Sequence, residues 1–356
     1  MINSFCEDFY KGKTVLVTGH TGFKGAWLSI VLINLGAKVV GYSLDPVDEK
    51  CIFNLSGLKS KMIDIRGDVR DINLLNTTFE KYQPEIVFHL AAQALVRDSY
   101  TSPVDTFDVN VMGTIHVMEA IRSSNSVRVS VLVTTDKCYE NREHFWGYRE
   151  NDPMGGHDPY SASKGACEIA IQSWRRSFFD NPNQKSISSV RAGNVIGGGD
   201  WAKDRIIPDC VNAIENGKPI EIRSPKSIRP WEHVLEPLSG YLLLAYKMWG
   251  NPQKYSGAWN FGPNLQSVVP VWDIASKVVH CFGKGEVVDI SDSQQPHEAK
   301  LLALDISKTY FLLGWKPCLD IDQTIQMTID WYKRYRHEDP FSLCTEQINY
   351  YFNETK

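Results

Sequence analysis

Hydrophobic and polar positions change period repeatedly along the first half of the chain. Short apolar runs rich in β-branched residues occur at 14–18, 38–44, 61–65, 85–90, 129–135 and 186–194. Between them, apolar residues recur at helical spacing at 23–36, around 71–82, at 107–124 and around 160–179. Strands that alternate with helices are typical of a parallel sheet covered on both faces, so the pattern predicts a doubly wound α/β fold.

The pattern changes after about residue 195. Gly, Pro, Trp and Arg become denser, as in "GGGDWAKDRIIP" and "RSPKSIRPWEH". Helical periodicity then returns at about 206–216, 233–249, 270–281 and 321–336. We therefore expect a first domain over 1–194 and a smaller mixed α/β lobe over 195–340, with some elements interleaved between the two. Residues 341–356 are polar, and we expect this tail to fray or to dock weakly.

Composition excludes several classes of protein. The 356 residues carry 38 basic and 42 acidic side chains, a net charge of -4, so nothing indicates a nucleic-acid or anionic membrane surface. No run approaches the roughly 20 apolar residues of a membrane span. The N-terminus lacks the basic start and apolar stretch of a signal peptide. The eight cysteines show no metal-ligand spacing, which predicts reduced thiols, no metal site and a cytoplasmic protein.

A glycine-rich loop follows the first predicted strand and opens the first predicted helix. "GHTGFKG" spaces Gly19, Gly22 and Gly25 as G-x-x-G-x-x-G. Such a turn lets the backbone approach a pyrophosphate, which the free N–H groups of the helix N-terminus attract. The loop residues expected to hold a dinucleotide are Gly19, His20, Thr21, Gly22, Phe23 and Gly25. The arrangement indicates a Rossmann-type cofactor domain rather than a tight structural turn.

Two acidic residues follow later strands of this domain. Asp45 comes 20 residues after Gly25, where a ribose hydroxyl is expected, and the residues after it are acidic. An additional ribose phosphate would be repelled there, so Asp45 favours NAD over NADP. Asp68 follows the third strand and is a candidate adenine contact, whereas Asp71 fits a helix N-cap better.

A tyrosine and a lysine share one face of a predicted helix. Tyr160 and Lys164 stand at i and i+4 in "DPYSASKGACE". A tyrosine is a poor base at neutral pH, and a nearby ammonium is expected to lower its pKa. By itself the pair is more typical of a solvated surface. Beside a dinucleotide loop, it predicts a base that removes a hydroxyl proton while hydride leaves for nicotinamide.

A third motif stands at the end of the fifth predicted strand. "TTDKCYE" places Asp136 and Lys137 side by side at a strand tip, where scaffolds often hold working residues. An exposed ion pair is the alternative interpretation of that dipeptide.

The glycine loop and the Tyr160–Lys164 pair resemble the extended short-chain dehydrogenase/reductase superfamily. "TTDKCYEN", "GGGDWAKDRIIPD" and "RPWEHVLEPLSGYL" resemble its nucleotide-sugar 4,6-dehydratases more narrowly, and within them the CDP-glucose branch, up to about residue 335. The resemblance implies NAD as cofactor and C4 oxidation of the sugar, elimination of water across C5–C6 and hydride return to C6. It also implies a bacterial surface-polysaccharide pathway and a homodimer or homotetramer assembled through helices at about 105–124 and 160–179.

The resemblance assigns roles at the strand tip. Asp136 is implied as the acid for the leaving C6 hydroxyl, and Thr135 as a hydrogen-bond partner of the C4 oxygen. Lys137 stands where the dTDP-glucose relatives have glutamate, as in the CDP-glucose branch. We expect Lys137 to be the C5 base, which requires a lowered pKa. Alternatively, its ammonium stabilises the enolate while Tyr160 or water is the base.

Further residues are expected around the cofactor and the nucleotide sugar. Leu90, Ala91 and Ala92 follow the fourth strand and would pass beneath the cofactor. Arginine suits a diphosphate because its fork is bidentate. The candidate substrate residues are Arg97, Asn110, Asn194, Arg205, Arg223, Arg229 and Trp231. For each arginine a surface role is an equal alternative; Trp231 borders the base pocket or belongs to the core, and Asn110 braces the site through a backbone bond or lies on a helix surface. His233, Trp201 and Trp259 are expected to be structural.

Three other functions share these motifs. A nucleotide-sugar 4-epimerase would use the glycine loop and the Tyr160–Lys164 pair but does not need Asp136 and Lys137. A simple NAD-dependent sugar oxidoreductase would release NADH. A non-catalytic NAD-binding protein would not need the complete set of Thr135, Asp136, Tyr160 and Lys164. A dehydratase acting on a UDP-, dTDP- or GDP-sugar remains open, because no local pattern identifies the base.

Overall fold

The computed structural model describes residues 8–179, 185–264, 267–291 and 301–354. Its centre is a seven-stranded parallel sheet in the order β10-β6-β5-β4-β1-β2-β3. The strands are β1 (Thr14–Thr18), β2 (Lys38–Ser43), β3 (Ile63–Arg66), β4 (Ile86–His89), β5 (Val129–Val133), β6 (Ser186–Ala192) and β10 (Ala258–Phe261). The doubly wound fold is therefore confirmed. The seventh strand, β10, was not predicted; it returns from the second half of the chain and pairs with β6.

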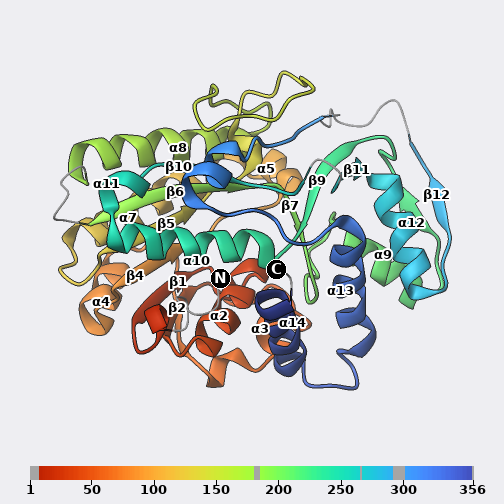
Figure 1. Ribbon diagram of the computed structural model, residues 1–356, viewed down its shortest axis with the longest axis horizontal. Coiled ribbons are helices and arrows are strands. Elements are labelled where there is room, and N and C mark those ends of the chain that lie inside the picture. Colours follow the sequence, from red (N-terminus) through yellow and green to blue (C-terminus); the bar gives the residue numbers. More distant parts are fainter. Residues whose placement is uncertain (1–7, 180–184, 265–266, 292–300, 355–356) are drawn as a thin grey trace.

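Period-2 alternation distributes each strand between two hydrophobic cores. In β1, Val15 and Val17 belong to one core, and Leu16 belongs to the other. Figure 1 shows α10 across the middle of the view, with α8 above it and α2 below it. The first core contains side chains of α2 (Phe23–Asn34) and α10 (Leu235–Gly250); the second contains side chains of α4 (Ile72–Tyr82), α7 (Gly113–Ser123) and α8 (Pro159–Phe178). Burial on both faces explains the near-continuous apolar runs.

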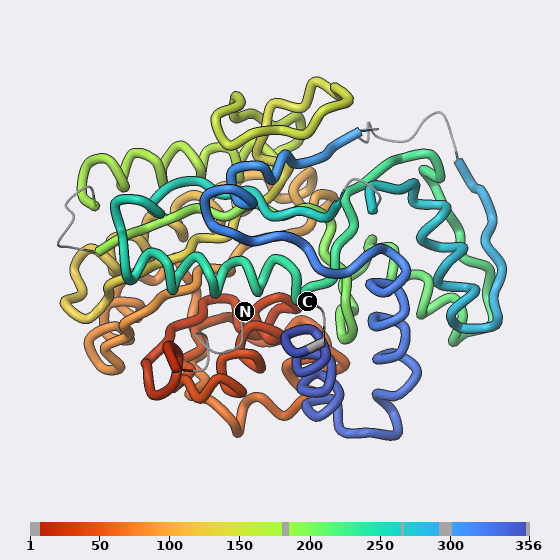
Figure 2. Tube along the Cα trace, viewed as in Figure 1, coloured from red at the N-terminus to blue at the C-terminus, as the bar shows by residue number. Residues whose placement is uncertain are grey.

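A second group of elements extends from one end of the sheet, at the right of Figures 1 and 2. Its strands are β7 (Asn194–Ile196), β9 (Ile228–His233) and β11 (Val268–Pro270) in one small sheet, and β8 (Ile220–Ile222) beside β12 (Val287–Asp289) in another. Its helices are α9 (Ile206–Glu215), α12 (Val271–Phe282) and α13 (Ile321–Arg334), all close to the predicted ranges. This mixed composition agrees with the expected substrate lobe, although the exact division of the chain stays a prediction.

The C-terminal segment differs from its prediction. Residues Pro340–Glu354 form helix α14, which lies beside α2 and α3 (Ile52–Leu55) (Figure 1). Leu343, Cys344, Ile348 and Tyr351 on this helix are buried in the first core. The prediction of a fraying or weakly docked tail was wrong, because its apolar residues recur three to four apart and cover one face of the helix. Among the described residues, no helix is both long and apolar enough to cross a membrane.

Candidate active site

The glycine loop joins β1 to α2 with the geometry that a pyrophosphate requires. Gly19 has φ +73°, and a Cβ there would lie 2.7 Å from the backbone nitrogen of Ala91. A Cβ on Gly25 would lie 2.1 Å from the Gly19 carbonyl oxygen. Gly22 is the N-cap of α2, with no side-chain cap and no acidic residue in the first turn. The first N–H groups of this helix are thus not used by a capping side chain, and the loop fits a dinucleotide.

Two other loop residues, His20 and Thr21, use their side chains to anchor the loop. His20 is fully buried, and its Nε2 lies 2.8 Å from Asp64 on β3. The Thr21 hydroxyl is 2.8 Å from the Ser43 hydroxyl and donates to the Leu44 carbonyl. Phe23 is half-buried at the start of α2. Only the backbone of His20 and Thr21 therefore remains available to a cofactor.

Asp45 lies at the rim of a cavity of about 550 Å³ beyond the end of β2. The other lining residues are Pro46, Val47, Asp48, Glu49, Asn54, Lys59, Asp64 and Arg66. Asp45 is 88 % exposed, and its Oδ1 lies 3.5 Å from Nε of Arg66. The residues that follow Asp45 in the sequence are acidic, but Arg66 reaches it from the neighbouring strand. The cavity stays predominantly acidic, which still favours a ribose hydroxyl over a ribose phosphate.

Asp68 and Asp71, which follow β3, were expected to be an adenine contact and a helix N-cap, respectively. The Asp68 carboxylate forms an ion pair with Arg70 at 2.6 Å, and this hydrogen-bonded pairing holds its pKa below the usual range. Asp71 is the N-cap of α4 and accepts from the N–H of Leu74. The N-cap prediction is confirmed for Asp71, and the adenine contact of Asp68 stays a prediction. Leu90, Ala91 and Ala92 are half-buried directly beyond β4, next to Gly19.

Asp136–Cys138 form a short 3₁₀ helix at the tip of β5, and Thr135 is its N-cap. Thr135 Oγ1 donates to Asp136 Oδ1 at 2.9 Å and accepts from the N–H of Lys137 at 3.3 Å. Asp136 is 2 % exposed, and its Oδ2 is buried without a hydrogen-bond partner among the described residues. Burial raises the pKa of Asp136, against the opposing charge of Lys137. The dipeptide is therefore not the exposed ion pair that was the alternative.

Tyr160 and Lys164 project from the first turns of α8 beside this tip. Asp158 caps the helix through the N–H of Ser161, and Pro159 follows as its first residue. Tyr160 and Lys164 are 8 % and 5 % exposed, so the surface interpretation of the pair was wrong. Burial lowers the pKa of Lys164.

The electrostatic environment of Tyr160 differs from the expected one. Burial raises its pKa in the protein alone, against the nearby Thr135 hydroxyl and the charge of Arg205. The prediction that Lys164 brings the tyrosine pKa down was therefore wrong for the protein without its ligands, because desolvation outweighs the neighbouring cations.

Asn110 braces the helix that carries Tyr160. It lies in a π-helical turn, Asp108–Met112, between α6 (Pro103–Phe107) and α7. Its Oδ1 accepts from the N–H of Gln93, and its Nδ2 donates to the Gln93 carbonyl and to the Ser163 hydroxyl. The predicted bracing through backbone bonds is confirmed. All of its amide atoms are used in this way, and it is fully buried, so it does not offer a substrate contact.

Three of the predicted substrate arginines gather near one loop of the lobe. Arg97 and Arg223 both pair with Asp204, at 3.2 and 2.9 Å, although they follow different strands. Arg205 pairs with the buried Asp200 at 2.7 Å and is close enough to Tyr160 to affect its pKa. The structure therefore brings these cations together at the end of the sheet where the strand tips lie, each with an acidic partner.

The remaining substrate candidates lie on β7 and β9. Asn194 and Trp231 are paired in register. Trp231 is 4 % exposed and donates to the Val269 carbonyl, which favours the core alternative. Arg229 is also buried, and its positive charge partly opposes the rise that burial causes in the pKa of Asp136. The structural role expected of His233 agrees with its full burial, which lowers its pKa to about 3.

Sequence analysis missed Lys24 and Glu232. Lys24 follows Phe23 in α2, and burial lowers its pKa to about 8, against the attraction of Glu232. Glu232 is 1 % exposed, and both carboxylate oxygens are buried without a hydrogen bond among the described residues. Burial raises its pKa well above the usual value. The charge of Lys24 opposes the rise in the Asp136 pKa, and the charge of Asp136 contributes to the rise in the Glu232 pKa. No local pattern in "GFKG" or "PWEH" indicates that these two charged side chains are buried near each other.

Comparison with known proteins identifies the family. The profile of the family described as GDP-mannose 4,6-dehydratase matches residues 16–328. The chain belongs to this family. A CDP-glucose 4,6-dehydratase of Salmonella typhimurium is 45 % identical over 354 residues, which cover 98 % of this chain and 99 % of that protein.

Solved structures agree on the fold of this 4,6-dehydratase family member. A dTDP-glucose 4,6-dehydratase from Bacillus anthracis in complex with NAD superposes with a TM-score of 0.78 at 18 % identity, covering 93 % of this chain and all of that one. A UDP-glucose 4-epimerase from Thermotoga maritima with UDP-glucose gives 0.76 at 20 % identity, covering 91 % and 100 %. Dehydratases and epimerases thus share this fold, so the two activities must be distinguished by the residues of the active site. Among the described residues, no cluster of three or more His, Cys, Asp or Glu is arranged for a metal ion.

Proposed function

We propose that the protein is an NAD-dependent 4,6-dehydratase that converts CDP-glucose to CDP-4-dehydro-6-deoxyglucose. The observation that carries this proposal is Asp136, a buried acid in the same site as Tyr160 and Lys164, with one carboxylate oxygen that has no hydrogen-bond partner among the described residues. Burial raises its pKa and so favours the protonated form, which can give a proton to a leaving hydroxyl. A 4-epimerase has no leaving group and does not need it.

The glycine loop and the acidic cavity support NAD as the cofactor. Backbone groups from Gly19 to Gly25 would hold the pyrophosphate, and Asp45 the ribose hydroxyls. Bound there, NAD would supply the acceptor for the hydride of C4 and the donor of hydride to C6. A positive charge beside Tyr160 would favour its phenolate, against the effect of burial.

The residues of the chain would then move three protons. Tyr160 takes the proton of the C4 hydroxyl, and Lys164 on the same helix face supports the phenolate. Asp136 gives its proton to the C6 oxygen, which leaves as water. Lys137, half-buried beside Asp136, takes the C5 proton and returns it, or its ammonium stabilises the enolate with Tyr160 or water as base.

The lobe supports a nucleotide diphosphate as the carrier of the sugar. Arg97, Arg205 and Arg223 offer planar donors near the catalytic tip, and their pairing with Asp200 and Asp204 keeps them in position before a diphosphate arrives. The choice of CDP rests on the relative that is 45 % identical over nearly the whole chain.

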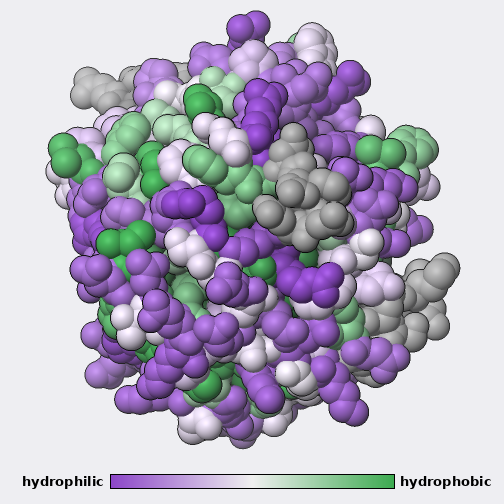
Figure 3. Space-filling view, turned by 90° about the vertical axis from the view of Figure 1, so that its left-hand side faces the viewer, coloured by the Kyte–Doolittle hydropathy of each residue, from purple (hydrophilic) through white to green (hydrophobic). Residues whose placement is uncertain are grey.

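We also propose a homodimer or homotetramer assembled through α7 and α8. Exposed apolar side chains on and before these helices support such an interface: Val104, Phe107, Met112, Ile169 and Phe178. Figure 3 shows apolar side chains gathered in the upper part of a mainly hydrophilic face. Cytoplasmic location and a role in bacterial surface polysaccharides stay predictions from the sequence.

One incubation tests the proposed function. The protein and NAD are mixed in D₂O with CDP-glucose, UDP-glucose, dTDP-glucose or a GDP-hexose in separate tubes, and proton NMR follows each. We expect a new C6 methyl signal with CDP-glucose alone and deuterium at C5. A methyl signal with another nucleotide would keep the reaction and change the substrate. Interconversion of hexose epimers without a methyl signal would identify an epimerase.

A further inference from the structure

The proposed reaction assigns its two stages to two different elements of the fold. Oxidation at C4 uses Tyr160 and Lys164 on α8, a helix of 20 residues. Elimination across C5–C6 uses Asp136 and Lys137, which belong to a 3₁₀ helix of only three residues. A 3₁₀ helix has poorer hydrogen-bond geometry than an α-helix, so such a short one stabilises itself weakly. The position of the elimination groups therefore depends on what holds the ends of this segment, residues 135–138, which we call the catalytic turn.

Hydrogen bonds within the catalytic turn are few. The N–H of Cys138 donates to the Thr135 carbonyl at 3.4 Å, a long bond. The Thr135 hydroxyl donates to Asp136 Oδ1 at 2.9 Å, and Asp136 Oδ2 has no partner among the described residues. Within the described part of the chain, the Asp136 carboxylate is thus hydrogen-bonded only inside the turn. Its position follows the backbone of the turn.

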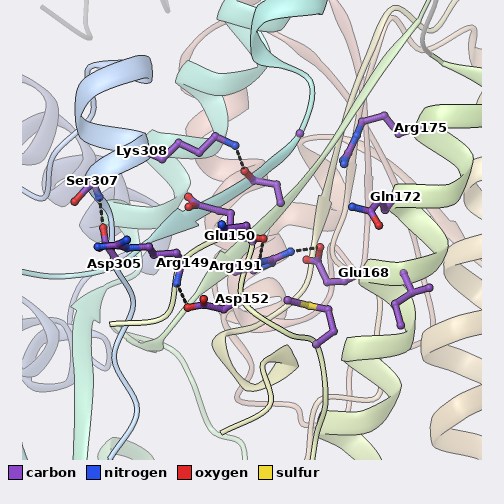
Figure 4. Close-up of a pocket in the computed structure, with 15 residues that line it drawn as sticks. Arg149, Glu150, Asp152, Glu168, Gln172, Arg175, Arg191, Asp305, Ser307 and Lys308 are labelled. Carbon is purple, nitrogen blue, oxygen red and sulfur yellow. Dashed lines mark hydrogen bonds and ion pairs between the residues drawn. The ribbon is translucent and has the colours of Figure 1, made fainter. Parts of the chain in front are cut away.

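Both ends of the catalytic turn are bonded to one buried ion pair, Glu168 with Arg191. Before the turn, the Thr134 hydroxyl donates to Glu168 Oε1 at 2.5 Å. After the turn, Arg191 Nη1 donates to the Tyr139 hydroxyl at 2.6 Å. Figure 4 shows the ion pair that joins these two bonds. All four side chains are more than nine-tenths buried, which strengthens hydrogen bonds to charged groups.

The Tyr139 hydroxyl can make its two bonds in only one way. A guanidinium only donates, so the hydroxyl oxygen accepts from Arg191 and its proton goes to Asn260 Oδ1 at 2.7 Å. The Asn260 amide nitrogen donates in turn to the carbonyls of Tyr148 and Asp305. Arg191 on β6 and Asn260 on β10 are paired in register. Tyr139 therefore attaches the far end of the turn to two neighbouring strands of the central sheet.

We propose that Thr134, Tyr139 and the Glu168–Arg191 pair are positioning residues for the elimination stage. This proposal rests on the dehydratase function above. By holding both ends of the catalytic turn, they place its acid at the C6 oxygen and its lysine at C5. A displacement of about 1 Å at the turn is enough to slow elimination strongly, whereas oxidation depends on α8 and continues.

Tyr139→Phe tests the far end of the turn, because it keeps the ring and removes the hydroxyl between Arg191 and Asn260. In single turnovers of CDP-glucose with enzyme in excess, absorbance of reduced nicotinamide measures oxidation, and rapid-quench analysis of the C6 methyl product measures elimination. We expect elimination to slow by roughly 10- to 100-fold while oxidation changes little. Reduced nicotinamide should then accumulate before product forms.

Tyr148→Phe is the matched control. Tyr148 is also buried, and its ring stacks on that of Tyr139 with the centroids 5.1 Å apart. Its hydroxyl donates to Asn141 and accepts from the N–H of Arg142, so it is bonded neither to the catalytic turn nor to the ion pair. We expect this variant to keep the wild-type ratio of oxidation rate to elimination rate.

Two substitutions at Thr134 test the near end of the turn. Thr134→Val keeps the shape and removes the donor to Glu168, which retains its bonds to Arg191 and to the Ser189 hydroxyl. Thr134→Ser keeps the hydroxyl. We expect reduced nicotinamide to accumulate in Thr134→Val as in Tyr139→Phe, and Thr134→Ser to behave as the wild type.

The ratio of the two rates separates positioning from a general contribution to stability. Partial unfolding would lower the amplitudes of both stages and leave the ratio of their rates unchanged. A ratio that stays at the wild-type value or falls, in either Tyr139→Phe or Thr134→Val, would overturn the attachment at both ends and leave the dehydratase reaction intact. Absence of any C6 methyl product from the wild-type protein would instead remove the dehydratase function, and the positioning role with it.

Discussion

Glu168 and Arg191 form a buried ion pair behind the catalytic segment, with Oε2 2.7 Å from Nη2 and both side chains 4 % exposed. Figure 4 shows the pair at the wall of a separate cavity of about 660 Å³. Burial disfavours the charge of Glu168, but Arg191 and the hydroxyls of Thr134 and Ser189 hold its pKa below the usual range. Thr134 donates to Oε1 at 2.5 Å. The Glu168 carboxylate thereby connects helix α8 to strand β6 and to Thr134, the residue before Thr135.

We expect Glu168→Gln to destabilise the protein by about 3–5 kcal/mol, because it leaves the buried Arg191 charge without its counterion. Urea unfolding measures the change. Glu215→Gln is a matched control, because Glu215 pairs with Arg336 at the surface, also at 2.7 Å, and should cost about 1 kcal/mol or less. Glu168→Gln combined with Arg191→Met should recover part of the loss. Equal losses for Glu168→Gln and Glu215→Gln would contradict this interpretation.

We expect Lys137→Met to stop exchange of the C5 proton with solvent while C4 oxidation continues. The reason is that Lys137 stands next to the acid Asp136 at the tip of β5, whereas C4 oxidation is assigned to the Tyr160–Lys164 pair on α8. Proton NMR in D₂O measures deuterium at C5, and absorbance of reduced cofactor measures oxidation. Normal turnover of the variant would disprove a role at C5.

Two further variants sharpen the Lys137 test. Lys137→Glu restores a base and should recover part of the C5 exchange if Lys137 is the base; it should not do so if the ammonium stabilises an enolate. Lys218→Met removes an exposed lysine after α9 and should leave both signals unchanged.

Helices and strands could be predicted well from the sequence, because their periodicity is local. Contacts between residues far apart in the sequence could be predicted less well. The strand from Thr14 to Thr18 and helix α8 were readable because burial imposes one period over consecutive residues. The proximity of Arg66 to Asp45 depends on the register between β2 and β3, which no local pattern reveals. The same holds for Glu232, whose burial depends on packing between the lobe and the sheet.

Arg66 gives a testable consequence for cofactor choice. Asp45→Asn removes a negative charge beside Arg66, which keeps its ion pair with Asp64 at 2.9 Å and offers a positive charge to a ribose phosphate. We expect weaker NAD binding and a ratio of the NADP to NAD dissociation constants that falls by about tenfold, equivalent to about 1.4 kcal/mol. Calorimetric titration of the protein with each cofactor measures the ratio. Arg66→Ala added to Asp45→Asn should reverse the gain in NADP binding, and an unchanged ratio in the double variant would exclude Arg66 as the cause.

Glu236 should make stability depend on pH. This carboxylate at the start of α10 accepts from the N–H groups of Cys318 and Leu319 and from the Tyr351 hydroxyl of α14, and burial raises its pKa from 4.5 to about 7. Between these values the folded protein keeps a proton that the unfolded chain has lost, so the free energy of unfolding falls as pH rises, by about 3 kcal/mol in total.

Glu236→Gln has no such proton and should lose this part of the dependence, as measured by urea unfolding at pH 5 and pH 8. Glu221→Gln, at an exposed position of β8, should keep the wild-type dependence. Identical pH dependence in Glu236→Gln and the wild type would show that Glu236 is ionised in the folded protein over this range.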